Sequence, residues 1–263
     1  MKKKEDNKKK IAITVDNLHV SYKSLVKKSI RSSWFKGFQK QETFEALKGI
    51  SFELEEGKIL GIIGKNGSGK STMLKAIAGI FSPDGGSVDL HGKTISLLSI
   101  GVGFNKKLTG YENIYLSGML LGFSEDEIKA KEQEIIEFAD IGKFIYKPVK
   151  TYSSGMYSKL AFAITAILET DIMLIDEVLS VGDAKFKKKS YKKMKELIFD
   201  EKRTVIIVSH NIDTLKQLCD QILWINDGEM IDIGEPDEIL PKYEEYMGIT
   251  EGDIEESEGS IDE

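Results

Sequence analysis

Apolar residues in this chain gather in short continuous runs, which alternate with longer segments where they recur every three or four positions. The runs have the length of buried strands and predict them at 11–22, 49–54, 59–63, about 88–100, 172–175 and 204–208. The periodic segments predict a helix from Lys70 to Ile80, a Lys-rich helix over 185–200 and a mainly helical region between about 105 and 170. A hairpin is predicted over 221–234, with its turn at Asp227-Gly228.

The order of these elements predicts an α/β fold. The runs at 59–63, 172–175 and 204–208 are apolar almost throughout, which is typical of parallel strands covered on both faces. The other early strands predict a small antiparallel layer against that parallel core. Within the helical region, Ser124 and Glu127 have the spacing of a capping box, and an apolar stripe follows them.

Length, charge and cysteine content narrow the class of protein. A chain of 263 residues suits one or two domains, and the lack of an internal repeat favours one. The net charge of −6 argues against a nucleic-acid-binding protein. The single Cys219 forms no internal disulfide, the apolar run after the basic residues 1–10 is too short for a signal peptide, and no stretch approaches the length of a membrane span. We expect a chain that is neither secreted nor membrane-spanning, with a flexible basic tail at 1–10 and a disordered acidic tail at 247–263.

A glycine-rich turn joins the strand at 59–63 to the helix that begins at Lys70. It consists of Gly64, Lys65, Asn66, Gly67, Ser68, Gly69, Lys70, Ser71 and Thr72. Glycine permits backbone angles closed to other residues, so successive N–H groups can point at phosphate oxygens while the helix N-terminus adds partial positive charge. Lys70 is suited to reach the β and γ phosphates, and the Ser71 hydroxyl to take one coordination position on Mg²⁺. The turn therefore predicts a site for a nucleoside triphosphate with Mg²⁺.

Polar side chains also follow two of the predicted parallel strands. Asp176 and Glu177 come directly after the strand at 172–175, and His210 closes the strand that begins at Thr204. The carboxyl ends of parallel strands meet at the edge of the sheet where ligands bind. Asp176 is suited to hold Mg²⁺, Glu177 to orient and deprotonate an attacking water, and His210 to contact the γ-phosphate. The set predicts hydrolysis of the terminal phosphate.

With these motifs the chain resembles the ATP-binding cassette (ABC) family over 11–235. Tyr152-Ser153-Ser154-Gly155-Met156 is similar to the signature segment of that family, which sits at a helix N-terminus and grips the γ-phosphate of ATP held by the opposite subunit. Ser180-Val181-Gly182-Asp183 stands in the place of the family's D-loop. Tyr22 matches the aromatic residue that stacks on adenine.

The resemblance implies an ABC-type P-loop ATPase domain over 11–246, with a RecA-like mixed sheet, an antiparallel β layer and a helical subdomain at about 101–168. Because the signature segment acts on the opposite subunit's nucleotide, the chain is expected to bind ATP and Mg²⁺ as a homodimer. The implied nucleotide-binding residues are Tyr22, the turn from Gly64 to Thr72, Ser153, Ser154, Gly155 and Asp183. The implied metal ligands are Ser71 and Asp176, and the implied catalytic residues are Glu177 and His210.

Departures from the general family pattern indicate one branch of it. Ser154 and Met156 stand where the family usually has Gly and Gln, Gly182 replaces the usual Leu, and no Gln is present near Ser99-Ile100. These features are similar to the cassettes that export cell-surface polysaccharides, above all teichoic acid exporters. Three further segments carry the same resemblance, at 108–114, 136–149 and 240–244.

This branch implies an ATP-hydrolysing subunit that joins two integral membrane permease subunits at the cytoplasmic face of the cell membrane and exports lipid-linked wall teichoic acid. Export of another surface polysaccharide, of the O-antigen or capsule type, is the alternative. The single cassette and the acidic balance disfavour a soluble ABC ATPase of DNA repair or translation. Glu177, His210 and the intact glycine-rich turn oppose an idle regulatory cassette.

Two segments are rich in lysine. The insertion over 23–43 interleaves Lys and Arg with apolar residues, which predicts a basic amphipathic segment. It is suited to meet lipid headgroups or the phosphates of a lipid-linked polymer, and packing of its aromatic residues on the cassette is the alternative. The cluster from Lys185 to Lys195 predicts a solvated helix face.

Overall fold

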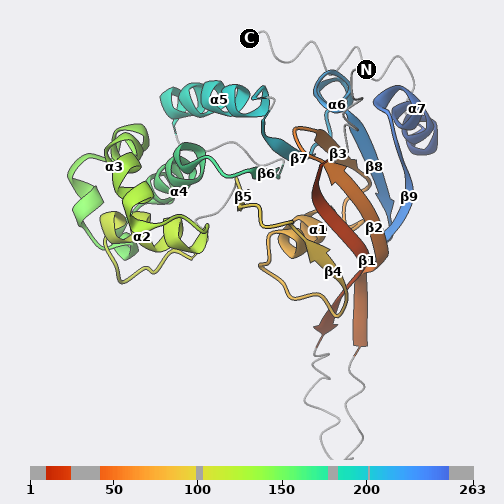
Figure 1. The fold of residues 1–263 in the computed structure, drawn as a ribbon, viewed down its shortest axis with the longest axis horizontal. Coiled ribbons are helices and arrows are strands. Elements are labelled where there is room, and N and C mark those ends of the chain that lie inside the picture. Colours follow the sequence, from red (N-terminus) through yellow and green to blue (C-terminus); the bar gives the residue numbers. More distant parts are fainter. Residues whose placement is uncertain (1–9, 25–41, 99–102, 177–182, 201, 249–263) are drawn as a thin grey trace, which may run out of the picture.

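The computed structural model describes the chain over 10–24, 42–98, 103–176, 183–200 and 202–248 (Figure 1). Most of both predicted tails and most of the predicted insertion lie outside the described residues. The described parts fold as two sheets with helices around them, and a separate group of helices lies beside the sheets.

Within the described residues, the larger sheet has six strands in the order β5-β6-β7-β3-β8-β9. They are β3 (Ile59–Ile63), β5 (Ile95–Leu97), β6 (Ile172–Ile175), β7 (Thr204–Val208), β8 (Gln221–Asn226) and β9 (Glu229–Gly234). Neighbouring strands run parallel except β8 and β9, which form the predicted antiparallel hairpin. Left-handed backbone angles at Asp227 (φ 49°) and Gly228 (φ 82°) make its turn. The predicted α/β fold with a mixed sheet is confirmed.

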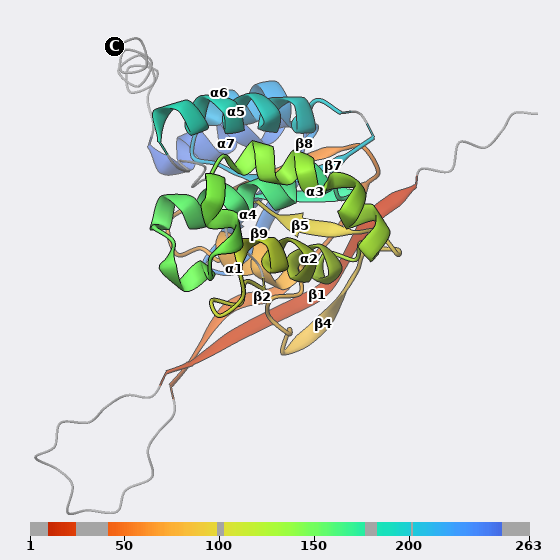
Figure 2. The ribbon, with the colours of Figure 1, turned by 90° about the vertical axis from the view of Figure 1, so that its left-hand side faces the viewer.

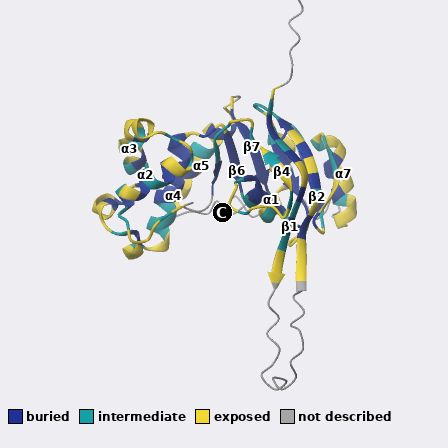
Figure 3. Cartoon of the chain, turned by 60° about the horizontal axis from the view of Figure 1, so that its bottom comes forward, coloured by how far each residue is buried: buried dark blue, intermediate teal, exposed yellow. Residues whose placement is uncertain are grey.

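A second, antiparallel sheet packs on the first and confirms the predicted β layer. Its order in the described residues is β2-β1-β4, with β1 at Ile11–Ser24, β2 at Glu42–Glu55 and β4 at Gly85–Asp89. Apolar side chains of both sheets meet between the layers, where Leu47 and Leu60 are fully buried. Along the strands, buried positions alternate with exposed ones (Figure 3). The second layer therefore covers one face of the larger sheet.

The strand predicted over 49–54 begins earlier, at Glu42. Its first half is too polar to be recognised from sequence, but it pairs with β1, and Tyr22 lies directly opposite Phe44. Pairing with β1 therefore stabilises a strand that the local sequence does not favour. The pairing continues to the ends of β1 and β2, so the insertion is the connection between two paired strands.

The prediction of a single strand over about 88–100 is wrong, because this segment contributes to β4 and β5, which belong to two different sheets. The chain turns between them at His91 and Gly92, where φ is 50° and 76°. The Asp89 carboxylate accepts a hydrogen bond from the N–H of His91 (2.8 Å) and stabilises this turn.

Helices cover the other face of the larger sheet and lie beside it, while the helix that follows β3 packs in the core between the two sheets (Figure 2). The described helices are α1 (Lys70–Ile77), α2 (Gly110–Leu120), α3 (Glu125–Ala139), α4 (Ser154–Leu168), α5 (Ala184–Ile198), α6 (Ile212–Leu218) and α7 (Pro236–Met247), with 3₁₀ turns η2 (Gly142–Tyr146) and η3 (Val149–Thr151). Helices α2, α3 and α4 surround an apolar cluster of their own. The predicted capping box at the start of α3 is confirmed. Helix α1 ends three residues before the predicted Ile80, since Gly79 has a left-handed φ of 70°.

Cys219 is a packing residue. It is 8% exposed, and its Sγ would lie 2.9 Å from a Cβ placed on Gly61 of β3. Burial, with a smaller effect of the neighbouring Asp220 charge, raises the pKa of the Cys219 thiol to about 12. The thiolate is therefore scarce at neutral pH, and the residue behaves as a small hydrophobe.

Candidate functional site

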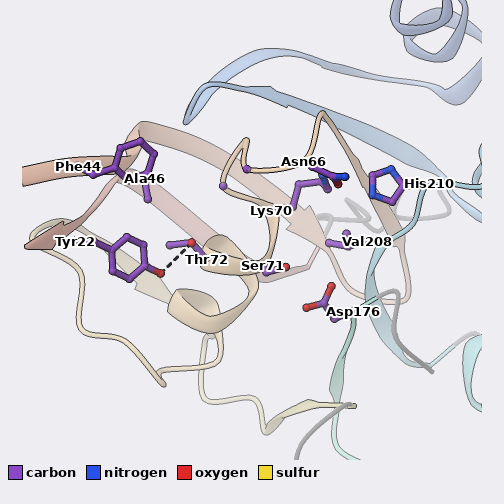
Figure 4. A pocket seen from close by; sticks show the side chains of 12 residues that line it. Tyr22, Phe44, Ala46, Asn66, Lys70, Ser71, Thr72, Asp176, Val208 and His210 are labelled. Atoms are coloured by element: carbon purple, nitrogen blue, oxygen red, sulfur yellow. Dashed lines mark hydrogen bonds between the residues drawn. The ribbon is translucent and has the colours of Figure 1, made fainter. Parts of the chain in front are cut away.

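Most of the predicted site residues meet in one cavity at the edge of the larger sheet. The cavity has a volume of about 370 Å³ and is lined by Tyr22, Phe44, Ala46, Asn66, Gly67, Gly69, Lys70, Ser71, Thr72, Asp176, Val208 and His210 (Figure 4). These residues come from β1, β2, the glycine-rich turn and α1, and from the ends of β6 and β7. Gly64, Lys65 and Ser68 belong to the same turn but do not line the cavity. The site lies where parallel strands end, as in other α/β folds.

The turn between β3 and α1 needs its glycines. Gly64, Gly67 and Gly69 have φ of 151°, 82° and 109°, values that residues with a Cβ rarely adopt. A Cβ on Gly64 would lie 2.1 Å from the carbonyl oxygen of Ile225, and one on Gly69 would lie 2.6 Å from that of Ala46. Glycine thus permits both the curvature of the turn and its close approach to neighbouring strands.

Neighbouring groups hold this turn in place. The N–H of Gly228, in the β8–β9 turn, donates a hydrogen bond to the carbonyl oxygen of Ser68 (3.0 Å). Lys70 is 7% exposed, and its ammonium donates to the carbonyl oxygens of Gly64 (2.6 Å) and Lys65 (2.9 Å). A buried cation therefore stands at the N-terminus of α1, where the helix dipole adds partial positive charge. The combination favours an anion in the cavity.

Gly69→Ala is expected to lower the free energy of unfolding by about 1–3 kcal/mol, because alanine would combine a strained φ with a clash against Ala46. Gly67→Ala is the matched variant. Its φ is also left-handed, but nothing lies within 4 Å of the added Cβ, so a loss of only about 1 kcal/mol is expected. Urea unfolding measures the free energy of unfolding of both variants. Equal decreases would show that the close approach of residue 69 to Ala46 does not contribute to the cost of the substitution.

Oxygen and imidazole groups face the turn from the neighbouring strands. Asp176 follows β6, His210 follows β7, and Ser71 stands in the first turn of α1 (Figure 4). A hydroxyl and a carboxylate are the oxygen ligands that Mg²⁺ takes, while water and phosphate oxygens complete its shell. Among the described residues, no group of three or more His, Cys, Asp or Glu side chains is arranged to hold a metal by itself. The donor set fits a Mg²⁺ ion that takes some of its ligands from the protein and the others from a bound phosphate and water.

Two aromatic rings stand at the same cavity, and only one of them was predicted. Tyr22 and Phe44 are directly paired across β1 and β2 and are 42% and 61% exposed. The Tyr22 hydroxyl is hydrogen-bonded to Thr72 Oγ1 (3.0 Å), and its ring packs edge-on against Phe81. Phe44 was not predicted, because the insertion separates it from Tyr22 in sequence and leaves no sign that the two residues are paired. An exposed aromatic pair beside an anion site suits a planar base.

The predicted signature residues do not line this cavity. Ser153, Ser154 and Gly155 form the N-terminus of α4, where the Ser153 hydroxyl accepts a hydrogen bond from the N–H of Met156 (3.2 Å). Both serines are exposed. A Cβ on Gly155 would meet only Ser153 Oγ, at 3.9 Å. This helix N-terminus is therefore open to an external group.

Asp183 does not line the cavity, and Glu177 lies outside the described residues. Asp183 is the N-cap of α5, and its carboxylate accepts hydrogen bonds from the Lys159 ammonium and from the N–H of Phe186 (2.9 Å). The bond from Lys159, followed by the backbone bond, holds the pKa of the Asp183 carboxyl below its usual value. Glu177 and the predicted D-loop residues 180–182 lie outside the described residues. Their roles stay predictions from sequence.

Comparisons with known proteins point to one family. The sequence model of the ABC transporter family matches residues 47–180. The O-antigen export system ATP-binding protein of Myxococcus xanthus is 44% identical over 206 residues, which make up 78% of this chain and 47% of that protein. A teichoic acids export ATP-binding protein of Bacillus anthracis is 48% identical over 202 residues, 77% of this chain and 36% of that protein.

Among solved structures, a dimeric ATP-binding cassette bound to ADP and Pi matches with a TM-score of 0.62 at 23% identity, over 85% of this chain and 98% of that one. This likeness shows the fold. The chain spans less than half the length of the two curated relatives. In the part of the chain that the structure describes, no helix is long and apolar enough to cross a membrane.

Proposed function

The chain belongs to the ABC transporter family, and from this premise we propose that it is the ATP-hydrolysing subunit of an exporter. The observation that carries the proposal is the single cavity in which the glycine-rich turn, Lys70, Asp176 and His210 meet. The exposed rings of Tyr22 and Phe44 at the same cavity suit the adenine of ATP better than a bare phosphate.

Each group of the site has one task in this proposal. The N–H groups of the turn and the Lys70 ammonium bind the β and γ phosphates. Ser71 and Asp176 hold Mg²⁺, which neutralises charge on the phosphate oxygens when bound. Glu177 takes a proton from the attacking water, and His210 orients that water against the γ-phosphate.

Two chains are proposed to share each ATP. Ser153, Ser154 and Gly155 do not line the cavity of their own chain, yet they form an exposed helix N-terminus, which is suited to an anion. In a homodimer this end of α4 would close the cavity of the opposite subunit. Asp183 stands at the start of α5, and its carboxylate accepts a hydrogen bond from Lys159 of α4. It therefore connects α4, whose N-terminus carries the signature residues, to the part of the chain that follows Glu177.

Complementation between two inactive chains tests this sharing. Glu177→Gln removes the proposed base, and Gly155→Asp places a charge at the helix N-terminus where nothing crowds the new side chain. Neither variant alone should hydrolyse ATP. In a mixture, mixed dimers contain one site with an intact base and an intact signature, so hydrolysis should return. A mixture as inactive as its components, although the two chains co-purify, would rule out a site shared between subunits.

The exported substrate is proposed to be lipid-linked wall teichoic acid. The proposal is supported by the Ser154 and Met156 departures and by the similarity to a teichoic acids export protein. The similarity to an O-antigen export protein makes another surface polysaccharide the alternative. Both substrates imply two integral membrane permease subunits and a place at the cytoplasmic face of the membrane.

The polymer that accumulates without this chain distinguishes the two substrates. Depletion in the source organism should leave lipid-linked polymer inside the cell. A phosphate-rich polymer with a phosphodiester backbone is the expected result, because teichoic acids are phosphate polymers. A retained polysaccharide free of backbone phosphate would assign the chain to export of the O-antigen or capsule type.

A further inference from the structure

Helix α7 contacts the glycine-rich turn through aromatic residues. Strands β3 and β8 are parallel neighbours, and Trp224 of β8 lies opposite Ile63, the last residue before the turn. The Trp224 ring packs edge-on against Tyr243 (5.6 Å between centroids) and at a tilt against Tyr246 (5.1 Å). Both tyrosines stand on one face of α7, three positions apart. The register of the sheet thus brings α7 to the entrance of the turn.

Two residues of the turn meet these tyrosines. The ammonium of Lys65 lies over the Tyr246 ring, 4.3 Å from its centroid. Burial raises the pKa of the Tyr243 hydroxyl, and the nearby backbone amide of Gly64 opposes this rise with a smaller lowering effect. The carbonyl oxygen of Gly64 accepts the hydrogen bond from Lys70 (2.6 Å). Gly64, the first residue of the turn, therefore lies between Tyr243 of α7 and the Lys70 ammonium.

Packing of α7 on the sheet accounts in full for other residues of the helix but only in part for Tyr246. Ile239 and Leu240 are 0% and 2% exposed and join the apolar cluster beneath α7. Tyr246 is 45% exposed, so about half of its surface contributes nothing to that cluster. Its specific contact is the cation of Lys65, a residue of the predicted nucleotide-binding turn.

We propose that Tyr243 and Tyr246 are positioning residues of the nucleotide site, which hold Gly64 and Lys65 so that the turn is ready to receive the phosphates of ATP. The inference rests on the proposed function and deepens it. A ring beneath Lys65 limits the conformations of the turn before ATP arrives, and such preorganisation strengthens binding. The groups proposed to act on the attacking water, Glu177 and His210, follow β6 and β7 along the chain, so the rate at saturating ATP is expected not to depend on α7.

The variant that isolates the aromatic face is Tyr246→Leu, which keeps an apolar side chain against Trp224 but removes the ring from Lys65. Its Kd and KM for Mg²⁺·ATP are expected to rise about two- to fivefold, as for an exposed cation–π contact, with kcat unchanged. Tyr246→Phe keeps the ring and should restore the native Kd. Tyr191→Leu is the matched control, since Lys195 lies 4.8 Å from the Tyr191 ring on α5, away from the cavity.

A double-mutant cycle assigns the effect to the pair. With Lys65→Met already present, Tyr246→Leu should cause no further rise in Kd. Tyr243→Phe, which removes only the hydroxyl at Gly64, tests the second contact and should also raise Kd while leaving kcat unchanged. Thermal unfolding of each variant excludes loss of folded protein as the cause.

The outcomes separate this inference from the proposed function. A native Kd in Tyr246→Leu, or a Tyr246→Phe variant as weak as Tyr246→Leu, would overturn the inference and leave the ATPase proposal intact. An equal rise in Tyr191→Leu would also overturn it, because the effect would then be nonspecific. A native chain that binds no ATP would overturn both.

Discussion

Lys70→Ala is expected to weaken binding of Mg²⁺·ATP by about 10- to 150-fold, which corresponds to about 1.5–3 kcal/mol for lost hydrogen bonds to a charged group. The Lys70 ammonium is nearly buried and already fixed by two carbonyl oxygens of the turn, so little ordering is needed when phosphate arrives. Equilibrium titration of the purified chain with ATP and Mg²⁺ measures the change.

Lys75→Ala is the matched control for this variant. Lys75 stands on the same helix, but its ammonium lies near the Phe81 ring (5.9 Å) and does not line the cavity. Lys75→Ala and Lys70→Ala each remove one positive charge from the chain, so the change in net charge is the same in the two variants. Similar losses in Lys70→Ala and Lys75→Ala would mean that Lys70 acts only through net charge, contrary to a direct role on the phosphates.

Glu177→Gln is expected to lower the rate of ATP hydrolysis by about 10² or more while ATP binding is kept, because the amide fills the same space but takes no proton from water. Glu177 follows Asp176, which the structure puts at the cavity. Steady-state phosphate release and ATP titration of the same sample separate turnover from affinity.

Glu196→Gln makes the same chemical change at an exposed position of α5 and should leave turnover unchanged. If Glu177→Gln kept full turnover, Glu177 would not be the base, and His210 would be the next group to examine because it lines the same cavity. If Glu177→Gln instead lost ATP binding, the residue would act on the ground state and not on the attacking water.

The parts of the site that the sequence predicts well are those defined by local chemistry. The turn from Gly64 to Thr72 needs glycine at fixed positions, and Asp176 and His210 follow apolar runs that end at one edge of a parallel sheet. No long-range information was needed to expect them together. The same holds for the hairpin at Asp227-Gly228, whose residue pair favours the observed turn.

What the sequence did not predict depends on contacts between distant segments. Phe44 lies opposite Tyr22 only because of the register in which β1 and β2 pair. The insertion between the two strands makes that register impossible to predict from sequence. Tyr243 and Tyr246 reach the glycine-rich turn through Trp224 and the pairing of β8 with β3. Spacing along the chain carries no signal for such contacts, because the strands that create them are far apart in sequence.

The measurement that tests the central claim most directly is the phosphate content of the cell wall in the source organism when the Glu177→Gln form replaces the native protein. If ATP hydrolysis by this chain drives teichoic acid export, wall phosphate falls sharply and the lipid-linked polymer is retained inside the cell. Unchanged wall phosphate in cells whose only copy of the protein is inactive would contradict the account.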